Sequence, residues 1–244
     1  MKVRLKSGNK LKLKTTAAFP NNVNYYSEGL ILNLDAGDSS SYPGSGTTWT
    51  DLSGNNNNGT LVNGPTYSSD DGGAIVFDGV NDVVTIPDDS AWNIGSAKTW
   101  EMWINMNSVV NNTLPFGKGA QWWFAVGYTA LGGTSGQFQW IAYDGSWSTL
   151  NTGVTISTST WYQLVTTWDG TYFRFYANGN LEATSSDLSA KTWSDSAYSV
   201  DVGGFSGGSS YVSAKIPIIR IYDQTLSAPQ VQQNFNALSS RYGL

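Results

Sequence analysis

The sequence predicts an all-β protein, a two-sheet antiparallel sandwich with an N-terminal β-hairpin arm and one short C-terminal helix. From Leu30 onward, short runs rich in Val, Ile, Thr, Trp, Tyr and Phe recur between clusters of Gly, Asn, Asp and Ser, which is typical of such a sandwich. An apolar pattern of helical period occurs only at the carboxyl end. The 244 residues fit one main domain of this class.

The first 28 residues, the predicted docking arm, differ in charge from the predicted domain over residues 29–244. No acid precedes Glu28, whereas residues 15–244 hold seven basic and eighteen acidic residues, a net charge of −11. Apolar and basic residues alternate on both sides of Ser7-Gly8-Asn9, which predicts a β-hairpin. The basic residues of this arm are Lys2, Arg4, Lys6, Lys10, Lys12 and Lys14.

An isolated hairpin is marginal in water, so we expect the arm to dock on another surface. The charge asymmetry favours a partner protein, and docking on the chain's own acidic body is the alternative. Amphipathic hairpins that meet at a symmetry axis would make a homotrimer natural. The arm also lacks the continuous apolar run of a secretion signal.

Within the body, the clearest strand pattern covers residues 137–143. Phe138, Trp140 and Ala142 alternate with mostly polar residues, so one face of this strand is predicted to be apolar. Asn178-Gly179 predicts a tight hairpin, because both residues tolerate positive φ. Most tryptophans are expected to fill the core; this set comprises Trp49, Trp100, Trp103, Trp161 and Trp168.

The predicted helix lies at the carboxyl end of the chain. Ser227 and Gln230 have the spacing of a capping box. One helical face then carries the apolar residues Val231, Phe235, Leu238 and Tyr242.

Composition excludes several classes of function. Cysteine and histidine are both absent, which rules out disulfides, thiolate zinc sites and catalysis by Ser-His-Asp or Cys-His groups. No apolar run reaches the 18 residues of a membrane helix, and the acidic body disfavours nucleic acid. The function classes that remain are catalysis by carboxylates, binding of a hard metal ion, and binding of a ligand without catalysis.

Eight segments that span most of residues 30–243 carry a family resemblance. They are LILNLDAG, WTDLSGNNNNGT, GGAIVFDGVND, TWEMWI, WYQLVTTWDGT, RFYANGNLE, IIRIYDQTLS and VQQNFNALSSRYG. In this order they resemble the laminin-G-like branch of the concanavalin A-like lectin and glucanase superfamily. The resemblance implies a two-sheet jelly roll, a scaffold that glycan-binding modules, adhesion domains, enzymes and virion proteins share.

A second resemblance concerns the arm. The segment KLKLKTTAAFPNNV from Lys10 is similar to leaders of structural proteins of tailed phages, particularly marine ones. It implies a protein displayed on the exterior of a virion, with the arm bound to other virion proteins.

The resemblance also bears on catalysis. Glucanases of this superfamily carry a Glu-x-Asp-x-x-Glu strand motif, and Glu101 is the nearest match, but Trp103 and Met106 stand at the other two positions. We therefore expect Glu101 to be a hydrogen-bonded strand carboxylate, and we expect no enzymatic activity.

The predicted carbohydrate site centres on the hairpin tip at residues 143–147. Aromatic rings bind the apolar faces of sugars, while amides and carboxylates bind the hydroxyls. In a strand, one of two adjacent tryptophans faces away from the core. The predicted set is Trp147, Tyr143, Asp144, Gln137, Gln139 and Trp122. The alternative is that these aromatics are core residues or ordinary exposed ones.

Two loops, DLSGNNNN and DGVND, suggest a calcium site. Calcium needs six to eight oxygen ligands from carboxylates, amides and carbonyls. The predicted ligands are Asp51, Asn55, Asn57, Asp78, Asn81 and Asp82. Ordinary turn chemistry explains the same residues, because Asx side chains bond to nearby backbone groups.

Together these observations predict a non-enzymatic, virion-displayed, lectin-like protein that binds surface glycans for adhesion. Two other functions stay open. One is a purely structural decoration or fibre protein without sugar binding. The other is a carbohydrate-binding module of a secreted bacterial enzyme.

Overall fold

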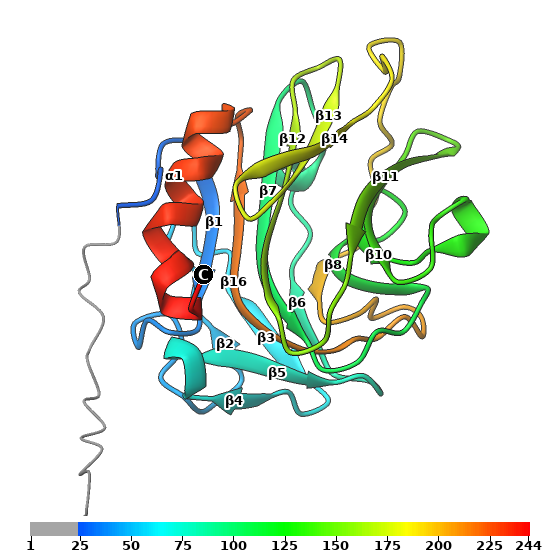
Figure 1. The fold of residues 1–244 in the computed structure, drawn as a ribbon. Coiled ribbons are helices and arrows are strands. Elements are labelled where there is room, and N and C mark those ends of the chain that lie inside the picture. Colours follow the sequence, from blue (N-terminus) through cyan, green and yellow to red (C-terminus); the bar gives the residue numbers. More distant parts are fainter. Residues whose placement is uncertain (1–23) are drawn as a thin grey trace, which may run out of the picture.

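The computed structural model describes residues 24–244 (Figure 1). The predicted hairpin arm and its basic residues lie outside the described residues. The described chain contains two antiparallel sheets of eight strands each and one α-helix, α1 (Ala228–Leu238). No helix of this part of the chain is long and apolar enough to span a membrane. The predicted fold class, an all-β two-sheet sandwich with a short C-terminal helix, is confirmed.

Sheet A carries the helix on its outer face, the face turned away from the other sheet. Its strands are β1 (Leu30–Asp35), β4 (Thr66–Ser68), β5 (Ala74–Asp78), β7 (Lys98–Met106), β12 (Trp161–Trp168), β13 (Phe173–Ala177), β14 (Asn180–Thr184) and β16 (Ser213–Tyr222). Their order is β14-β13-β12-β7-β16-β5-β4, with β1 paired to β16. Strand β14 is therefore an edge strand.

Sheet B faces sheet A across the core. Its strands are β2 (Thr48–Trp49), β3 (Gly59–Val62), β6 (Val83–Ile86), β8 (Thr113–Lys118), β9 (Trp122–Val126), β10 (Gln137–Tyr143), β11 (Trp147–Thr155) and β15 (Val200–Val202). The order is β11-β10-β9-β8-β15-β6-β3-β2. Strand β11 is thus an edge strand and, as Figure 1 shows, lies on the same side of the sandwich as β14.

The core between the sheets follows the predicted alternation. Phe138, Trp140 and Ala142 of β10 point into it, and the polar face of that strand points outward. The five tryptophans predicted to be core residues are all buried. Trp103 and Trp161, however, lie on the outer face of sheet A and are buried under the C-terminal segment, so their strands have apolar residues on both faces.

Helix α1 is positioned by the predicted features. The backbone N–H of Ser227 donates to Oε1 of Gln230 at 2.7 Å, as in a capping box. Val231 and Leu238 are fully buried against sheet A, and Phe235 stacks on Trp103. The helix, red in Figure 1, crosses the outer side of β1 and β16.

A buried polar network lies between sheet A and α1. Glu101 is fully buried, and its carboxylate accepts hydrogen bonds from Gln163 Nε2 at 2.9 Å and Asn234 Nδ2 at 2.8 Å. Arg220, also buried, places its guanidinium 3.6 Å from the same carboxylate. Glu101 is therefore the predicted hydrogen-bonded strand carboxylate, balanced by a neighbouring cation.

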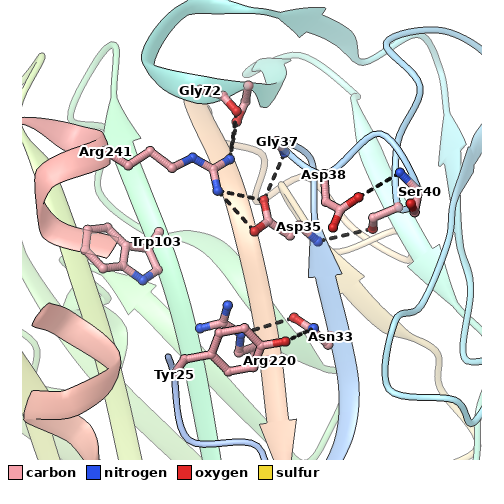
Figure 2. A network of polar contacts seen from close by, with 12 residues as sticks. Tyr25, Asn33, Asp35, Gly37, Asp38, Ser40, Gly72, Trp103, Arg220 and Arg241 are labelled. Carbon is pink, nitrogen blue, oxygen red and sulfur yellow. Dashed lines mark hydrogen bonds and ion pairs between the residues drawn. The ribbon is translucent and has the colours of Figure 1, made fainter. Parts of the chain in front are cut away.

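The first described residues belong to this network. The guanidinium of Arg220 lies 3.8 Å from the ring centre of Tyr25, and Asn33 bonds to both residues (Figure 2). The N–H of Tyr26 donates to Asn234 on the helix at 2.8 Å. Tyr25 and Tyr26 thus contact the body, and the domain boundary near Glu28 stays a prediction.

The hairpin predicted at Asn178-Gly179 joins β13 and β14. Asn178 has φ of 50° and Gly179 has φ of 79°, the left-handed conformation that a two-residue turn of this kind requires.

Candidate functional site

The hairpin between β10 and β11 presents the predicted aromatic pair. Tyr143 and Trp147 are opposite each other in the strand register, so their side chains share the outer face of sheet B. Their ring centres are 4.9 Å apart, with an angle of 50° between the planes. Trp147 is 38% exposed. Because the ring packs against Tyr143, it is held in place while one side stays open to solvent.

Asp144 shapes the turn of this hairpin. Its Oδ1 accepts from the backbone N–H and the hydroxyl of Ser146, at 3.2 and 2.9 Å. Its Oδ2 lies 2.7 Å from Nζ of Lys191. The hydrogen bond from Lys191 holds the pKa of Asp144 below its ordinary value. The carboxylate is thus ionised at neutral pH and already engaged by a cation.

Beside Trp147 the outer face of sheet B is hollowed. This aromatic hollow has a volume of about 310 Å³, at the lower end of the range for small-ligand sites. Trp123 of β9 and Ile141 of β10 contribute from the sheet, and Trp147 forms one side. The remaining sides include Tyr128, Leu131 and Phe205. A ligand with an apolar face would find aromatic surface on several sides.

Two loops far apart in sequence supply those remaining sides. Tyr128 and Leu131 come from the segment around the short 3-10 helix Thr129–Leu131 after β9. Phe205 comes from the loop after β15 and packs edge-on against Trp123, with 5.5 Å between ring centres. The hollow therefore depends on contacts between segments some eighty residues apart.

A buried carboxylate holds the Phe205 loop in place. Asp201 accepts from the N–H and the hydroxyl of Ser206, at 2.8 and 2.7 Å, and from the hydroxyl of Ser199 at 2.6 Å. In the described part of the chain it has no ion-pair partner. Burial raises the pKa of Asp201 above its ordinary value.

The other residues predicted to contact sugar have different positions. Gln137 and Gln139 face outward as expected, but Gln139 is buried and its amide bonds to Tyr128 N and Asn151. Trp122 is wholly buried between the sheets. Its neighbour Trp123 has the outward position, so the prediction is one residue out of register. Alternation shows that one of the two tryptophans faces outward, but it does not show which.

The two loops predicted to bind calcium do not form a common site. Asp51 bonds to the backbone N–H of Asn33, which lies opposite Arg220 on β16, whereas Asp78 lies opposite Ser213. Seven residues along a strand correspond to roughly 20 Å. Within residues 24–244, no three acidic side chains are grouped to hold one metal ion.

The carboxylates of each loop instead accept hydrogen bonds from nearby backbone N–H groups. Asp51 accepts from the backbone N–H groups of Asn33, Ser53 and Asn57. Asp78 accepts from the N–H of Val80. This is turn chemistry, and calcium binding at a single loop stays a prediction.

Comparison with known proteins places the chain in a family. A laminin-G-like model, described as concanavalin A-like lectin/glucanases superfamily, matches residues 78–232. The chain belongs to this superfamily. The match confirms the resemblance of the sequence motifs. No curated protein matches the chain in sequence.

Solved structures of similar fold include binding domains and one enzyme domain. The binding domain of Paraclostridial Mosquitocidal Protein 1 has a TM-score of 0.69 and 16% identity, over 86% of this chain and 52% of that one. Domain 4 of AbnA, an extracellular arabinanase from Geobacillus stearothermophilus, was solved with arabinotriose. It has a TM-score of 0.67 and 16% identity, over 86% of this chain and 98% of the domain.

A third similar structure is the ligand binding domain of botulinum neurotoxin serotype D in complex with N-acetylneuraminic acid. The TM-score is 0.66 and the identity 14%, over 86% of this chain and 51% of that one. The chain spans about half the length of the two toxin domains, whereas it spans nearly all of the arabinanase domain. At these identities the comparison establishes the fold.

Proposed function

We propose that the protein is a non-enzymatic, lectin-like module that binds glycans at the aromatic hollow. The observation that carries this proposal is Trp147, an exposed tryptophan fixed against Tyr143 at the rim of a hollow. Sugar rings present apolar C–H faces that pack on aromatic rings, and their hydroxyls bind polar groups at the rim. Tyr143, whose ring packs on Trp147, carries one such polar group, its hydroxyl.

The family and the similar structures support this proposal. The superfamily includes lectins. The arabinanase domain that the chain covers almost completely was solved with an oligosaccharide. The position of Glu101 supports a function without catalysis, because this carboxylate is sealed under α1 by Asn234 and Arg220. A glycosidase needs two carboxyl groups that reach the substrate.

The test is a glycan array with neutral and sialylated oligosaccharides, run once with calcium and once with a chelator. We expect specific binding that falls at least tenfold in Trp147→Ala, about 1.4 kcal/mol. The matched control is Leu181→Ala, because Leu181 is also exposed, at 52%, but lies on β14. Binding that disappears only with the chelator would support calcium. A blank array under both conditions would contradict glycan binding and favour a purely structural decoration role.

We further propose that the basic arm attaches this module to an assembled particle, such as a phage virion exterior, as one subunit of a trimer. The charge contrast between the six basic residues before residue 15 and the net charge of −11 after it favours this role. A chain that starts at Asn24 should keep glycan binding but lose particle attachment and trimer mass in light scattering. If this shortened chain still assembled, the arm would not be the docking element.

A further inference from the structure

The lining of the aromatic hollow is aliphatic as well as aromatic. Leu114 and Ile141 pack with Trp123 in one buried apolar cluster on the outer face of sheet B, and Leu131 packs against that cluster. Both exposed and buried parts of the lining share this character, since the aliphatic lining residues are Leu114, Ala120, Ala130, Leu131 and Ile141. A group that enters the hollow therefore has to be apolar to gain from its burial there.

The hydroxyl groups of a sugar ring are poorly matched to this lining. A hydroxyl that leaves water without finding a hydrogen-bond partner costs free energy. None of the lining side chains is acidic, basic or an amide. A plain hexose can stack on Trp147 at the rim with its hydroxyls in water, but a hexose that entered the hollow would bury several hydroxyls without side-chain partners.

The few polar atoms of the lining side chains are mainly hydrogen-bond donors. They are the indole N–H groups of Trp123 and Trp147 and the hydroxyl of Tyr128. An indole N–H only donates, whereas a tyrosine hydroxyl donates or accepts. This lining therefore suits a group that combines a hydrogen-bond acceptor with a small apolar end.

The acetamido group of an N-acetylated amino sugar has both properties. Its carbonyl oxygen accepts hydrogen bonds, its methyl group is apolar, and it carries no charge. The volume of the hollow, about 310 Å³, is at the lower end of the range for small-ligand sites. It fits one sugar unit with its substituent better than several units.

We propose that the aromatic hollow selects sugars that carry an acetamido group. The sugar ring stacks on Trp147, and the methyl end of the acetamido group packs against Leu131 and the buried apolar cluster. This inference rests on the proposed glycan-binding function and adds the class of sugar. Trp147 contributes affinity for any sugar with an apolar face, and the aliphatic lining contributes the preference.

The experiment compares sugars that differ at a single position by titration calorimetry. Two pairs differ by an acetamido group in place of a hydroxyl: the methyl glycosides of N-acetylglucosamine and glucose, and those of N-acetylgalactosamine and galactose. A third pair, L-fucose and L-galactose, differs by a methyl group that has no carbonyl beside it. Binding to each sugar is measured for the parent protein and for four variants.

The variants separate the lining from the rim. Leu131→Asn replaces an aliphatic lining side chain by a polar one of similar size. Its matched control is Leu52→Asn, because Leu52 is also half-buried but follows β2, at the opposite edge of sheet B. Ala130→Phe fills the hollow from an exposed position, where a larger side chain leaves the buried cluster intact. Trp147→Ala removes the stacking surface.

For at least one of the first two pairs, we expect the acetamido sugar to bind tenfold or more tightly than its hydroxyl counterpart. Such a factor is typical of a group that fills a hydrophobic pocket. Leu131→Asn and Ala130→Phe should remove most of this preference, and Leu52→Asn should keep it. Trp147→Ala should weaken the binding of both members of a pair by similar factors.

Equal affinity within both acetamido pairs, or tighter binding of the hydroxyl sugar, would overturn this inference while the proposed function stands. A preference that survives in both Leu131→Asn and Ala130→Phe would also overturn it, because the acetamido group would then bind elsewhere. A preference found only in the L-fucose pair would assign the hollow to a deoxy sugar instead. Absence of binding to every sugar in the parent protein would overturn both proposals.

Discussion

The outer faces of the two sheets both carry aromatic residues but differ in how completely the rest of the chain covers them. On sheet A, Trp103 and Trp161 point outward and are covered: Trp103 stacks on Phe235 of α1, and Trp161 packs on Tyr242 with 4.6 Å between ring centres. On sheet B, Trp123 also points outward and is covered by loops, but Trp147 beside it is 38% exposed at the rim of a hollow. Outward aromatic residues therefore do not by themselves identify a binding face. A face is open for binding only where no other segment of the chain covers these residues.

The buried carboxylates on the two faces also have different partners. Glu101 on sheet A has Arg220 beside it and two side-chain amides bonded to it. Asp201 on sheet B has only hydroxyl and backbone donors. A buried charge with a partner leaves a large penalty when that partner is removed. The covered face should therefore be important for stability, and the open face should be important mainly for binding.

The largest effect is expected from breaking the covered face. Glu101→Ala leaves the guanidinium of Arg220 buried without its anion, so the free energy of unfolding should fall by about 3 to 5 kcal/mol. The measurement is urea denaturation followed by tryptophan fluorescence. The control Glu182→Ala removes an exposed glutamate of β14 and should change stability by no more than about 0.5 kcal/mol. Equal stability of the two variants would show that the network contributes little.

The sequence predicts the covered and open faces unequally well. Strand alternation, the Asn178-Gly179 turn and the capping box at Ser227 are local signals, and the structure confirms them. The network around Glu101 is not predicted in the same way. Its partners Arg220 and Asn234 lie more than a hundred residues away, and only an arginine inside the apolar run IIRIYD hints at a buried charge.

For the candidate site, the sequence predicts the hairpin tip but not its surroundings. Tyr143 and Trp147 follow from a five-residue pattern whose register is fixed by the turn. Phe205 and Leu131 reach the hollow from loops, and loop paths depend on tertiary contacts that have no local period. The contact between β11 and β14 depends on how the two sheets pack on each other, which no local pattern in the sequence reports. Alternation alone does not distinguish Trp122 from Trp123 as the outward tryptophan.

A smaller effect is expected at the amino-terminal end of the covered face. A chain that starts at Gly29 lacks the Tyr25 ring over Arg220 and the Tyr26 N–H bond to Asn234. It should be less stable than a chain that starts at Asn24 by about 2 to 4 kcal/mol, since a desolvated cation–π contact and buried hydrogen bonds contribute about that much. Urea denaturation of both chains measures the difference. Identical midpoints would support the boundary predicted near Glu28.

The smallest effect is expected on the open face and depends on pH. Burial raises the pKa of Asp201, so the folded protein holds a proton there more tightly than the unfolded chain, whose Asp pKa is about 3.9. The stability that comes from this proton is present at low pH and is lost as the pH rises through the raised pKa. Asp201→Asn carries no titrating group. The unfolding free energy of the parent relative to this variant should therefore increase as the pH falls from 7 to 4.

Asp187 provides a control of opposite sign for this pH dependence. Hydrogen bonds from Ser189 lower the pKa of Asp187, so its contribution is present above the unfolded pKa and is lost as the pH falls. The parent should thus lose stability relative to Asp187→Asn only as the pH falls below about 4, whereas its gain relative to Asp201→Asn comes between about pH 7 and 4. If both comparisons had the same sign, burial would not govern Asp201, and the hydrogen bonds from Ser199 and Ser206 would stabilise its charged form. An ionised Asp201 would then hold the loop that carries Phe205. The buried carboxylates on the two faces of the sandwich would in that case differ less than their hydrogen-bond partners indicate.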